Sequence, residues 1–213
     1  MRRNRDRTKE AILNAAEDVF ARRGFDATTL EQIGTGSGFS RSTAAYFFGS
    51  KSDLYEAVLA RVIARAEQAM LAAFAQARPD SRPEDAVATY VSVYLDFLAT
   101  DHAYLRLIQR ESLGDVSRVA QLFGRPVDEA VTALTPAAEK AGVSAQQLLL
   151  DLTALCWYPF AHEHTLLPAL GLSPRDPAFL AEHKRHVTAL VGALGHLRGA
   201  TRTHADSDGH RTG

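Results

Sequence analysis

Hydrophobic residues recur at helical spacing along most of this chain. In the first such segment, residues 8–23, the apolar positions lie on one face of a helix, at Ile12, Leu13, Ala16, Val19 and Phe20. Gly24 follows directly and is typical of the residue just beyond a helix C-terminus. The alternating pattern of β-strands is absent from the sequence. The pattern therefore predicts an all-α fold of about nine helices.

Residues 30–48 have the pattern of two short helices joined by a tight turn. Leu30 and Ile33 stand one helical turn apart and share a face. Gly38 supplies the backbone freedom that a tight turn requires, and Ser40 is a favourable N-cap for the next helix. This segment predicts a helix-turn-helix.

The second of these two helices has an anchoring face and a polar face. Its anchors are predicted to be Ala44, Phe47 and Phe48. The side chains left to face outward are polar or cationic: Arg41, Ser42, Thr43 and Tyr46. A short helix that presents such groups fits the major groove of DNA.

The same window contains three closely spaced glycines, which raises the alternative of a nucleotide-binding loop. Residues 34–39 begin like a dinucleotide fingerprint, but Phe39 occupies the last glycine position and no strand precedes the segment. The sequence also lacks the Gly-Lys-Ser or Gly-Lys-Thr of a phosphate loop and a Gly-x-Ser-x-Gly elbow. We expect Gly34 instead to allow close approach of the second helix.

Helical patterns continue to the C-terminal region. Ser50 and Asp53 form a predicted capping box for a helix that reaches about Ala77, before a linker at 78–83. Gly124 and Pro126 are expected to kink or split one later helix, and Pro159 to kink another. The later predicted helices are 84–100, 101–112, 115–141, 144–167 and 174–197.

The charge of the chain is unevenly distributed. Residues 1–66 hold 11 Lys/Arg and 8 Asp/Glu, a net charge of +3, whereas the remainder holds 13 and 17, a net charge of −4. The basic excess gathers at the N-terminus, in Arg2, Arg3, Arg5, Arg7 and Lys9. Such an arm can lie along phosphates or reach a minor groove, or it can be a solvated disordered terminus.

Composition restricts the compartment and the chemistry. Cys156 is the single cysteine, which excludes an intramolecular disulfide and predicts a buried small hydrophobe in a reducing compartment. No apolar run approaches the roughly 20 residues that span a bilayer, so we expect a cytoplasmic protein.

The histidines do not form a recognisable metal site. His162 and His164 are spaced to face different sides of a helix. His183 and His186 share a face but lack a third ligand, so these two are expected to be solvated or at a subunit contact. The sequence predicts no metal, no cofactor and no catalytic residues.

A wider set of residues resembles the N-terminal domain of TetR-type repressors. The matching positions are Ile12-Leu13-x-Ala-Ala16, Phe20-x-x-x-Gly24-Phe25, Thr28-Thr29, Ile33, Gly38-Phe39-Ser40, Phe48 and Ser50-Lys51. The likeness covers residues 7–65. It implies a three-helix DNA-binding head, a fourth connecting helix, a larger domain for ligand binding and dimerisation, and transcriptional control. The predicted regions are 1–66 for the head with its basic arm, 67–199 for the larger domain and 200–213 for a disordered tail.

The chain departs from the family pattern at several positions of the helix-turn-helix. The family commonly has Ala at Gly34 and at Ser37, Val at Phe39, and a Leu-Tyr pair at Ala44-Ala45. That tyrosine often touches the DNA backbone. Ala45 cannot make this contact, and Tyr46 is the candidate to replace it.

The predicted DNA-binding residues are Thr29, Ser40, Arg41, Ser42, Thr43, Tyr46 and Lys51. Arg41 can pair with a guanine edge, or it can bind a phosphate without sequence preference. Thr29 and Lys51 stand at helix starts, where a phosphate is favoured. Two heads related by twofold symmetry would read a palindromic operator.

The larger domain contains residues suited to a ligand pocket and others suited to a dimer interface. The predicted ligand-binding residues are Tyr94, Phe97, Tyr104, Phe123, Trp157 and Phe160, which suit an apolar or aromatic effector. The predicted dimer helices carry two apolar sets: Leu148, Leu149, Leu152, Leu155 and Phe160, and Phe179, Val187, Leu190, Val191, Leu194 and Leu197.

Together these features predict a homodimeric, ligand-responsive repressor that reads a palindromic operator. Two alternatives from other classes stay open. One is a small all-α enzyme, although no nucleophile–base pair is recognisable. The other is a helical interaction protein whose basic N-terminus binds acidic partners without sequence-specific DNA binding.

Overall fold

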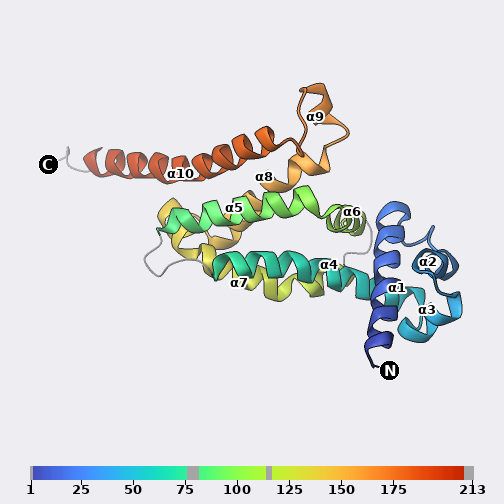
Figure 1. Cartoon of the computed structure of the whole chain (residues 1–213). Coiled ribbons are helices and arrows are strands. Elements are labelled where there is room, and N and C mark those ends of the chain that lie inside the picture. Colours follow the sequence, from blue (N-terminus) through green and yellow to red (C-terminus); the bar gives the residue numbers. More distant parts are fainter. Residues whose placement is uncertain (1, 76–81, 114–116, 209–213) are drawn as a thin grey trace. The chain divides into compact units, whose positions relative to one another are not determined.

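The computed structural model describes residues 2–75, 82–113 and 117–208, and the side chains of 3–75, 82–113 and 122–193. Every regular element in these residues is an α-helix, which confirms the predicted fold class (Figure 1). The helices are α1 (Arg2–Arg23), α2 (Leu30–Ser37), α3 (Arg41–Phe48), α4 (Lys51–Phe74), α5 (Pro83–Thr100), α6 (His102–Glu111), α7 (Ser117–Ala141), α8 (Ala145–Ala161), α9 (Leu166–Ala169) and α10 (Pro177–Asp208).

The chain divides into two compact units. The first contains residues 1–67 and 101–124, and the second contains residues 68–100 and 125–213. The first unit thus includes α6 and the start of α7, which the sequence prediction placed in the larger domain. The functional boundary after residue 66 stays a prediction.

The first unit is built around α1, with α2 and α3 beside it (Figure 1). Its buried side chains come from α1 to α4 and from α6, and they include Ile12, Ala16, Phe20, Ile33, Ala44, Leu54, Tyr55, Val58 and Leu107. The rings of Phe20 and Tyr55 meet edge to face, with centroids 4.8 Å apart. These contacts hold the helix-turn-helix against α1 and α4.

An ion-pair cluster joins α1, α4 and the start of α6 within this unit. The Arg65 guanidinium donates to Asp101 Oδ2 at 2.7 Å and to Glu17 Oε1 at 2.8 Å. Asp101 also accepts from the backbone N–H of Tyr104 and so caps α6. Partial burial opposes the charge on Arg65, but hydrogen bonds to Glu17 and Asp101 outweigh this effect and raise the pKa of the guanidinium. One side chain therefore connects three helices.

Replacing Arg65 by Met is expected to lower the free energy of unfolding by about 1–3 kcal/mol. The methionine keeps the apolar stem, but Asp101, whose side chain is only 12% exposed, loses its guanidinium partner. Urea unfolding followed by circular dichroism measures the change. Arg22→Met is the control, because Arg22 pairs with Asp18 on the exposed surface and should change stability by less than about 1 kcal/mol. Equal losses in the two variants would contradict the role given to Arg65.

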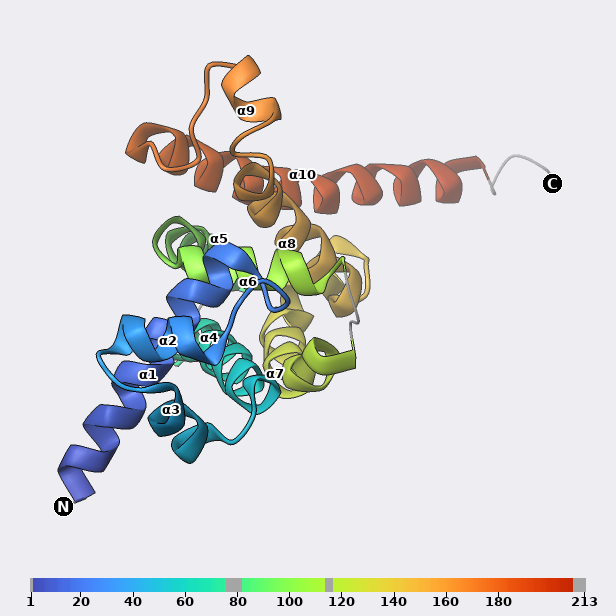
Figure 2. The same cartoon turned by 90° about the vertical axis from the view of Figure 1, so that its right-hand side faces the viewer.

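The second unit is organised around α5, which packs against both α8 and α10. Val91, Leu95 and Leu98 of α5 are fully buried, and so is Leu152 of α8. The Tyr90 hydroxyl and Thr153 Oγ1 lie 2.7 Å apart and link α5 to α8. Figure 2 shows α9 in the connection between α8 and α10. None of the helices in the described part of the chain is long and apolar enough to cross a membrane.

Several element boundaries differ from the predicted ones. The predicted helix at 144–167 is interrupted by turns at 162–165, so that α8 and α9 are separate and the helices described number ten. Gly124 and Pro126 lie inside α7, which is not split. The final helix runs to Asp208 and enters the predicted tail, of which residues 209–213 lie outside the described part. Residues 78–81 of the predicted linker and the predicted helix start at 115–116 also lie outside it.

Cys156 and His183 are two residues whose environments were predicted and are described by the structure. Cys156 is fully buried on α8, as predicted, and burial raises the pKa of its thiol to about 12. His183, by contrast, is not simply solvated: its Nε2 lies 3.0 Å from the carbonyl oxygen of Leu155, and its ring stacks on Phe179. The fold brings α8 and α10 together at this point and gives the imidazole a partner within the chain.

Candidate DNA interface

The turn between α2 and α3 follows the predicted geometry. Thr29 and Gln32 form a capping box at the start of α2, and Gly38 ends that helix at φ 76°, in the left-handed region. Gly34 lies against the incoming chain: a Cβ there would be 2.9 Å from the backbone nitrogen of Arg41. The absence of a side chain at Gly34 thus permits the predicted close approach of α3.

The start of α3 is held by a small hydroxyl cluster. Ser40 Oγ accepts from the backbone N–H of Thr43 at 3.1 Å, which confirms Ser40 as the N-cap. The same oxygen lies 2.8 Å from Ser42 Oγ and 2.9 Å from Thr43 Oγ1. Ser40 therefore orients the first turn of α3, and Ser42 and Thr43 extend the hydroxyl cluster along it.

The outer edge of α3 presents the side chains that the sequence assigned to it. Arg41 and Ser42 are exposed, Thr43 is half-buried, and Tyr46 is 73% exposed. The opposite edge is anchored by Ala44, which is fully buried. Arg41 has no hydrogen-bonding or ionic partner among the described residues, so its five N–H donors are available to an acceptor from outside.

Two cations of α1 flank this edge. The Arg5 guanidinium lies 5.9 Å from the Tyr46 ring centroid, and the Lys9 ammonium lies 5.6 Å from that of Phe48. The sequence prediction began this helix at residue 8 and left the basic residues as an arm, whereas α1 begins at Arg2. The i, i+4 spacing of Arg5 and Lys9 is the signal that could have placed both on one helical face. They add positive charge beside α3.

Lys51 has a partner that sequence reasoning missed. Its Nζ donates to the backbone oxygen of Phe25 at 3.0 Å and lies 4.2 Å from the Phe25 ring centroid. Lys51 thus fastens the start of α4 to the segment after α1. An ammonium has three N–H donors, so this contact leaves donors for a phosphate.

The start of α4 carries the predicted capping box. Asp53 Oδ2 accepts from the backbone N–H of Ser50 at 2.9 Å and from Ser50 Oγ at 2.7 Å. The hydrogen bond from the Ser50 hydroxyl, followed by the one from its backbone, lowers the pKa of Asp53 below its usual value. This carboxylate already occupies the positive end of α4, so a phosphate at that helix start depends more on Lys51 than on the helix dipole.

Asp53→Asn is expected to lower the melting temperature at neutral pH and to lose this effect in acid. The folded-state pKa of Asp53 is depressed, so its stabilisation is present above the unfolded-state pKa and is lost as the pH falls through the folded-state pKa. The gap between wild type and variant should be constant above about pH 5 and should close below about pH 4. Thermal unfolding at a series of pH values measures the gap. Asp26→Asn, at an exposed carboxylate without a partner in the described chain, is the control. A gap of the same size at every pH would contradict the role of the carboxylate.

The six aromatic residues predicted for ligand binding are distributed over both units. Tyr104 and Phe123 belong to the first unit, whereas Tyr94, Phe97, Trp157 and Phe160 belong to the second. Tyr94, Tyr104 and Phe160 are buried, and the other three are half-buried. Their role in binding an effector stays a prediction.

Known regulators resemble this chain in both of its helical regions. Residues 12–58 match the family described as bacterial regulatory proteins, tetR family, and residues 83–191, about half of the chain, match the tetracyclin repressor-like C-terminal domain. The chain is 28% identical over 208 residues to the HTH-type transcriptional repressor NicS of Pseudomonas putida, covering 92% of this chain and 94% of that one. It is 29% identical over 190 residues to the HTH-type transcriptional regulator RutR of Escherichia coli, covering 86% and 88%.

Solved structures share the fold at lower identity. FadR from Bacillus subtilis, in complex with stearoyl-CoA, superposes with a TM-score of 0.66 at 14% identity, over 85% of this chain and 96% of that one. The fatty acid degradation regulator FadR from Bacillus halodurans superposes with a TM-score of 0.63 at 15% identity, over 84% and 97%. The two helical regions thus occur together in known regulators.

Proposed function

Because the chain belongs to the TetR family of bacterial regulatory proteins, and is therefore a DNA-binding transcriptional regulator and not an enzyme, we propose that it acts as a homodimeric, ligand-responsive repressor. Each protomer places the N-terminal half of α3 in the major groove of one half-site. The two half-sites form a palindrome with centres about one helical turn, or a multiple of it, apart. The protein acts in the cytoplasm, where this DNA is found.

The main support for the proposed DNA-binding surface is the exposed edge of α3. Arg41 projects there without a partner in the described chain, beside the hydroxyls of Ser42 and Thr43. We assign Arg41 to a guanine edge through two parallel hydrogen bonds. Thr29, Tyr46 and Lys51 bind phosphates and set the register without reading sequence. Ser40 supports this surface through its cap.

The proposed dimer uses the exposed faces of α8 and α10. Many residues predicted for this interface are already buried within one chain, among them Leu148, Leu152, Phe160, Val187 and Val191, and these cannot be its contact face. Leu194 and Leu197 lie outside the described side chains. Exposed apolar positions on these helices include Leu150, Ala154 and Tyr158 on α8, spaced at i, i+4 and i+8, and Leu190 on α10. We assign the dimer contact to these residues.

Effector binding in the helical body would alter the separation of the two heads, so that both no longer fit one face of the duplex. The support for a ligand is that the solved FadR of Bacillus subtilis, a regulator with the same fold, holds stearoyl-CoA. An apolar or aromatic effector would suit the predicted aromatic residues of the body.

Selection of bound sites from random double-stranded DNA tests the proposal. We expect a palindromic site, bound in the presence of excess non-specific competitor, and a dimeric mass by light scattering at micromolar concentration. Strong salt dependence without sequence preference would favour the helical interaction protein instead, because phosphate contacts alone produce it. A monomeric mass together with a non-palindromic selected site would contradict the proposed dimer.

A further inference from the structure

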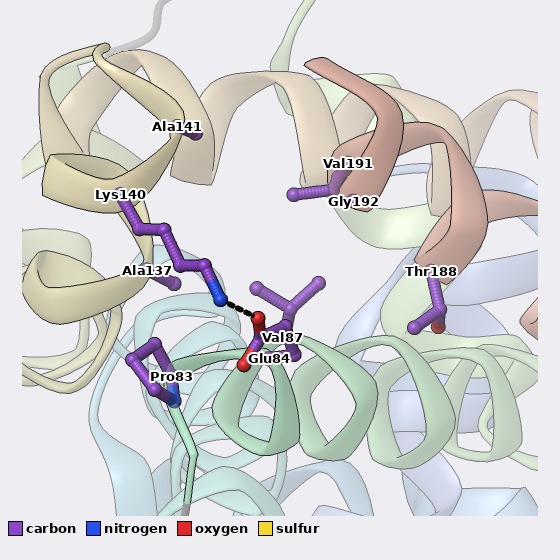
Figure 3. A pocket seen from close by; sticks show the side chains of 9 residues that line it. All are labelled: Pro83, Glu84, Val87, Ala137, Lys140, Ala141, Thr188, Val191 and Gly192. Carbon is purple, nitrogen blue, oxygen red and sulfur yellow. Dashed lines mark hydrogen bonds and ion pairs between the residues drawn. The ribbon is translucent and has the colours of Figure 1, made fainter. Parts of the chain in front are cut away.

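A pocket of about 210 Å³ lies in the second unit between α5, α7 and α10 (Figure 3). None of the six aromatic residues predicted for ligand binding lines it. Its walls are aliphatic side chains such as Val87 of α5 and Val191 of α10. Three lining residues are small, namely Ala137, Ala141 and Gly192, and they leave the space between the helices unfilled.

One side of the pocket is polar. Figure 3 shows Lys140 of α7 reaching across to Glu84 in the first turn of α5. Both side chains are partly exposed, 60% for Lys140 and 41% for Glu84, so the ion pair lies in a well-solvated position and is weak. Such a pair can be opened or shared by an incoming ligand at little cost.

The two partners of this ion pair differ in solvent exposure and in the hydrogen-bonding groups that they leave unused. The hydrogen bond from Lys140 and a second one from the backbone N–H of Glu84 itself lower the pKa of Glu84. The Glu84 carboxylate is therefore ionised and accepts from two donors. The Lys140 ammonium has three N–H donors and uses one for Glu84, with no other partner in the described chain. Glu84 also keeps unused acceptor sites, but Lys140 is the more exposed of the two, so its remaining donors are the more accessible, which favours an anionic or hydrogen-bond-accepting ligand group.

The size of the pocket limits the apolar part of the ligand. An apolar cavity of about 150 Å³ in another protein holds benzene. The pocket here is larger by about the volume of a small substituent. Its aliphatic walls favour an apolar ring or branched chain in contact with Val87 and Val191.

We propose that this pocket binds a compact monocarboxylate, with a body of about one six-membered ring between α5 and α10 and a carboxylate that accepts hydrogen bonds from Lys140. A cation of the same size would instead pair with Glu84, the less exposed partner. The binding site itself does not depend on the proposed function. Only the statement that the bound carboxylate is the effector rests on it.

Calorimetric titration of the DNA-free, full-length protein tests the site, with benzoate, cyclohexanecarboxylate and isovalerate as probes and benzylamine as the cationic counterpart. We expect at least one carboxylate to bind, and to bind about tenfold or more tighter than benzylamine. Lys140→Met should weaken carboxylate binding by about tenfold or more, since it keeps the apolar stem and removes the donors. Absence of binding by all three carboxylates at 10 mM, or equal binding of benzylamine, would overturn the proposal.

Gly192 supplies a matched pair of variants. A Cβ at Gly192 meets nothing within 4 Å, so a side chain there enters open space, and replacing glycine inside a helix raises helix propensity. Gly192→Leu should fill the pocket and abolish carboxylate binding while the protein remains folded. Gly192→Ala should leave the affinity within about threefold, because one methyl group takes up little of the space. Unchanged binding in Gly192→Leu would place the ligand elsewhere and overturn the assignment.

A parallel measurement of operator affinity separates this proposal from the proposed function. Release of the selected operator on addition of the carboxylate, lost in Gly192→Leu, would support the effector role. Carboxylate binding without any change in operator affinity would overturn the effector role and leave the binding site in place. Intact operator binding with no carboxylate binding would overturn the pocket proposal alone.

Discussion

Replacing Leu150 by glutamate is expected to convert the protein to a monomer and to weaken operator binding by about a hundredfold or more. Leu150 is 61% exposed on α8, in line with Ala154 and Tyr158, and is the most exposed large apolar side chain of the proposed dimer contact. Two symmetry-related carboxylates at that place would have to be buried without partners. A monomer holds one half-site only and loses the gain that comes from linking two heads.

Light scattering at several micromolar concentrations measures the mass, and titration of the selected operator measures the affinity. Leu170→Glu is the matched control, because Leu170 is 60% exposed but follows α9, away from the α8 stripe in sequence. We expect Leu170→Glu to remain dimeric. A dimer that survives Leu150→Glu, or dissociates only in Leu170→Glu, would contradict the assigned interface.

Arg41→Ala is expected to remove the preference for one base pair in each half-site. A bidentate contact between arginine and guanine contributes about 1–3 kcal/mol of discrimination, which is about five- to 150-fold per half-site. The dimer contains two such contacts, so the total loss for the symmetric operator is about twice that free energy. Arg41 is exposed and unpartnered in the described chain, so its removal should leave the fold of the first unit unchanged.

Binding to a panel of operator variants, each with one changed base pair, measures this effect at fixed salt concentration. Arg41→Lys should recover affinity but little of the preference, since an ammonium lacks the planar pair of donors. Tyr46→Phe is the matched contact variant: it removes one proposed phosphate hydrogen bond and should weaken all operators alike. Identical preference profiles for wild type and Arg41→Ala would show that Arg41 binds a phosphate.

The sequence alone determined the helical fold and the shape of the helix-turn-helix. These features depend on residues that are neighbours along the chain. Thr29, Ser40 and Ser50 cap helices through atoms three residues away, and Gly38 adopts the left-handed turn that its neighbours require. The apolar stripe from Ile12 to Phe20 likewise identifies the buried face of α1 before any partner is known. Local geometry and helical periodicity are sufficient for such predictions.

The tertiary structure decided which side chains meet across long separations. Lys51 is bound to Phe25, and Arg65 joins Glu17 to Asp101, although nothing in the spacing of these residues indicates a contact. The predicted dimer face shows the same limit, because Leu148 and Leu152 are apolar, as predicted, but pack within their own chain. The pocket beside Lys140 also depends on three helices that leave space next to small residues. Helical periodicity predicts which face of a helix is apolar. Whether that face packs within its own chain or stays exposed, and whether space is left beside it, depends on how separate helices pack.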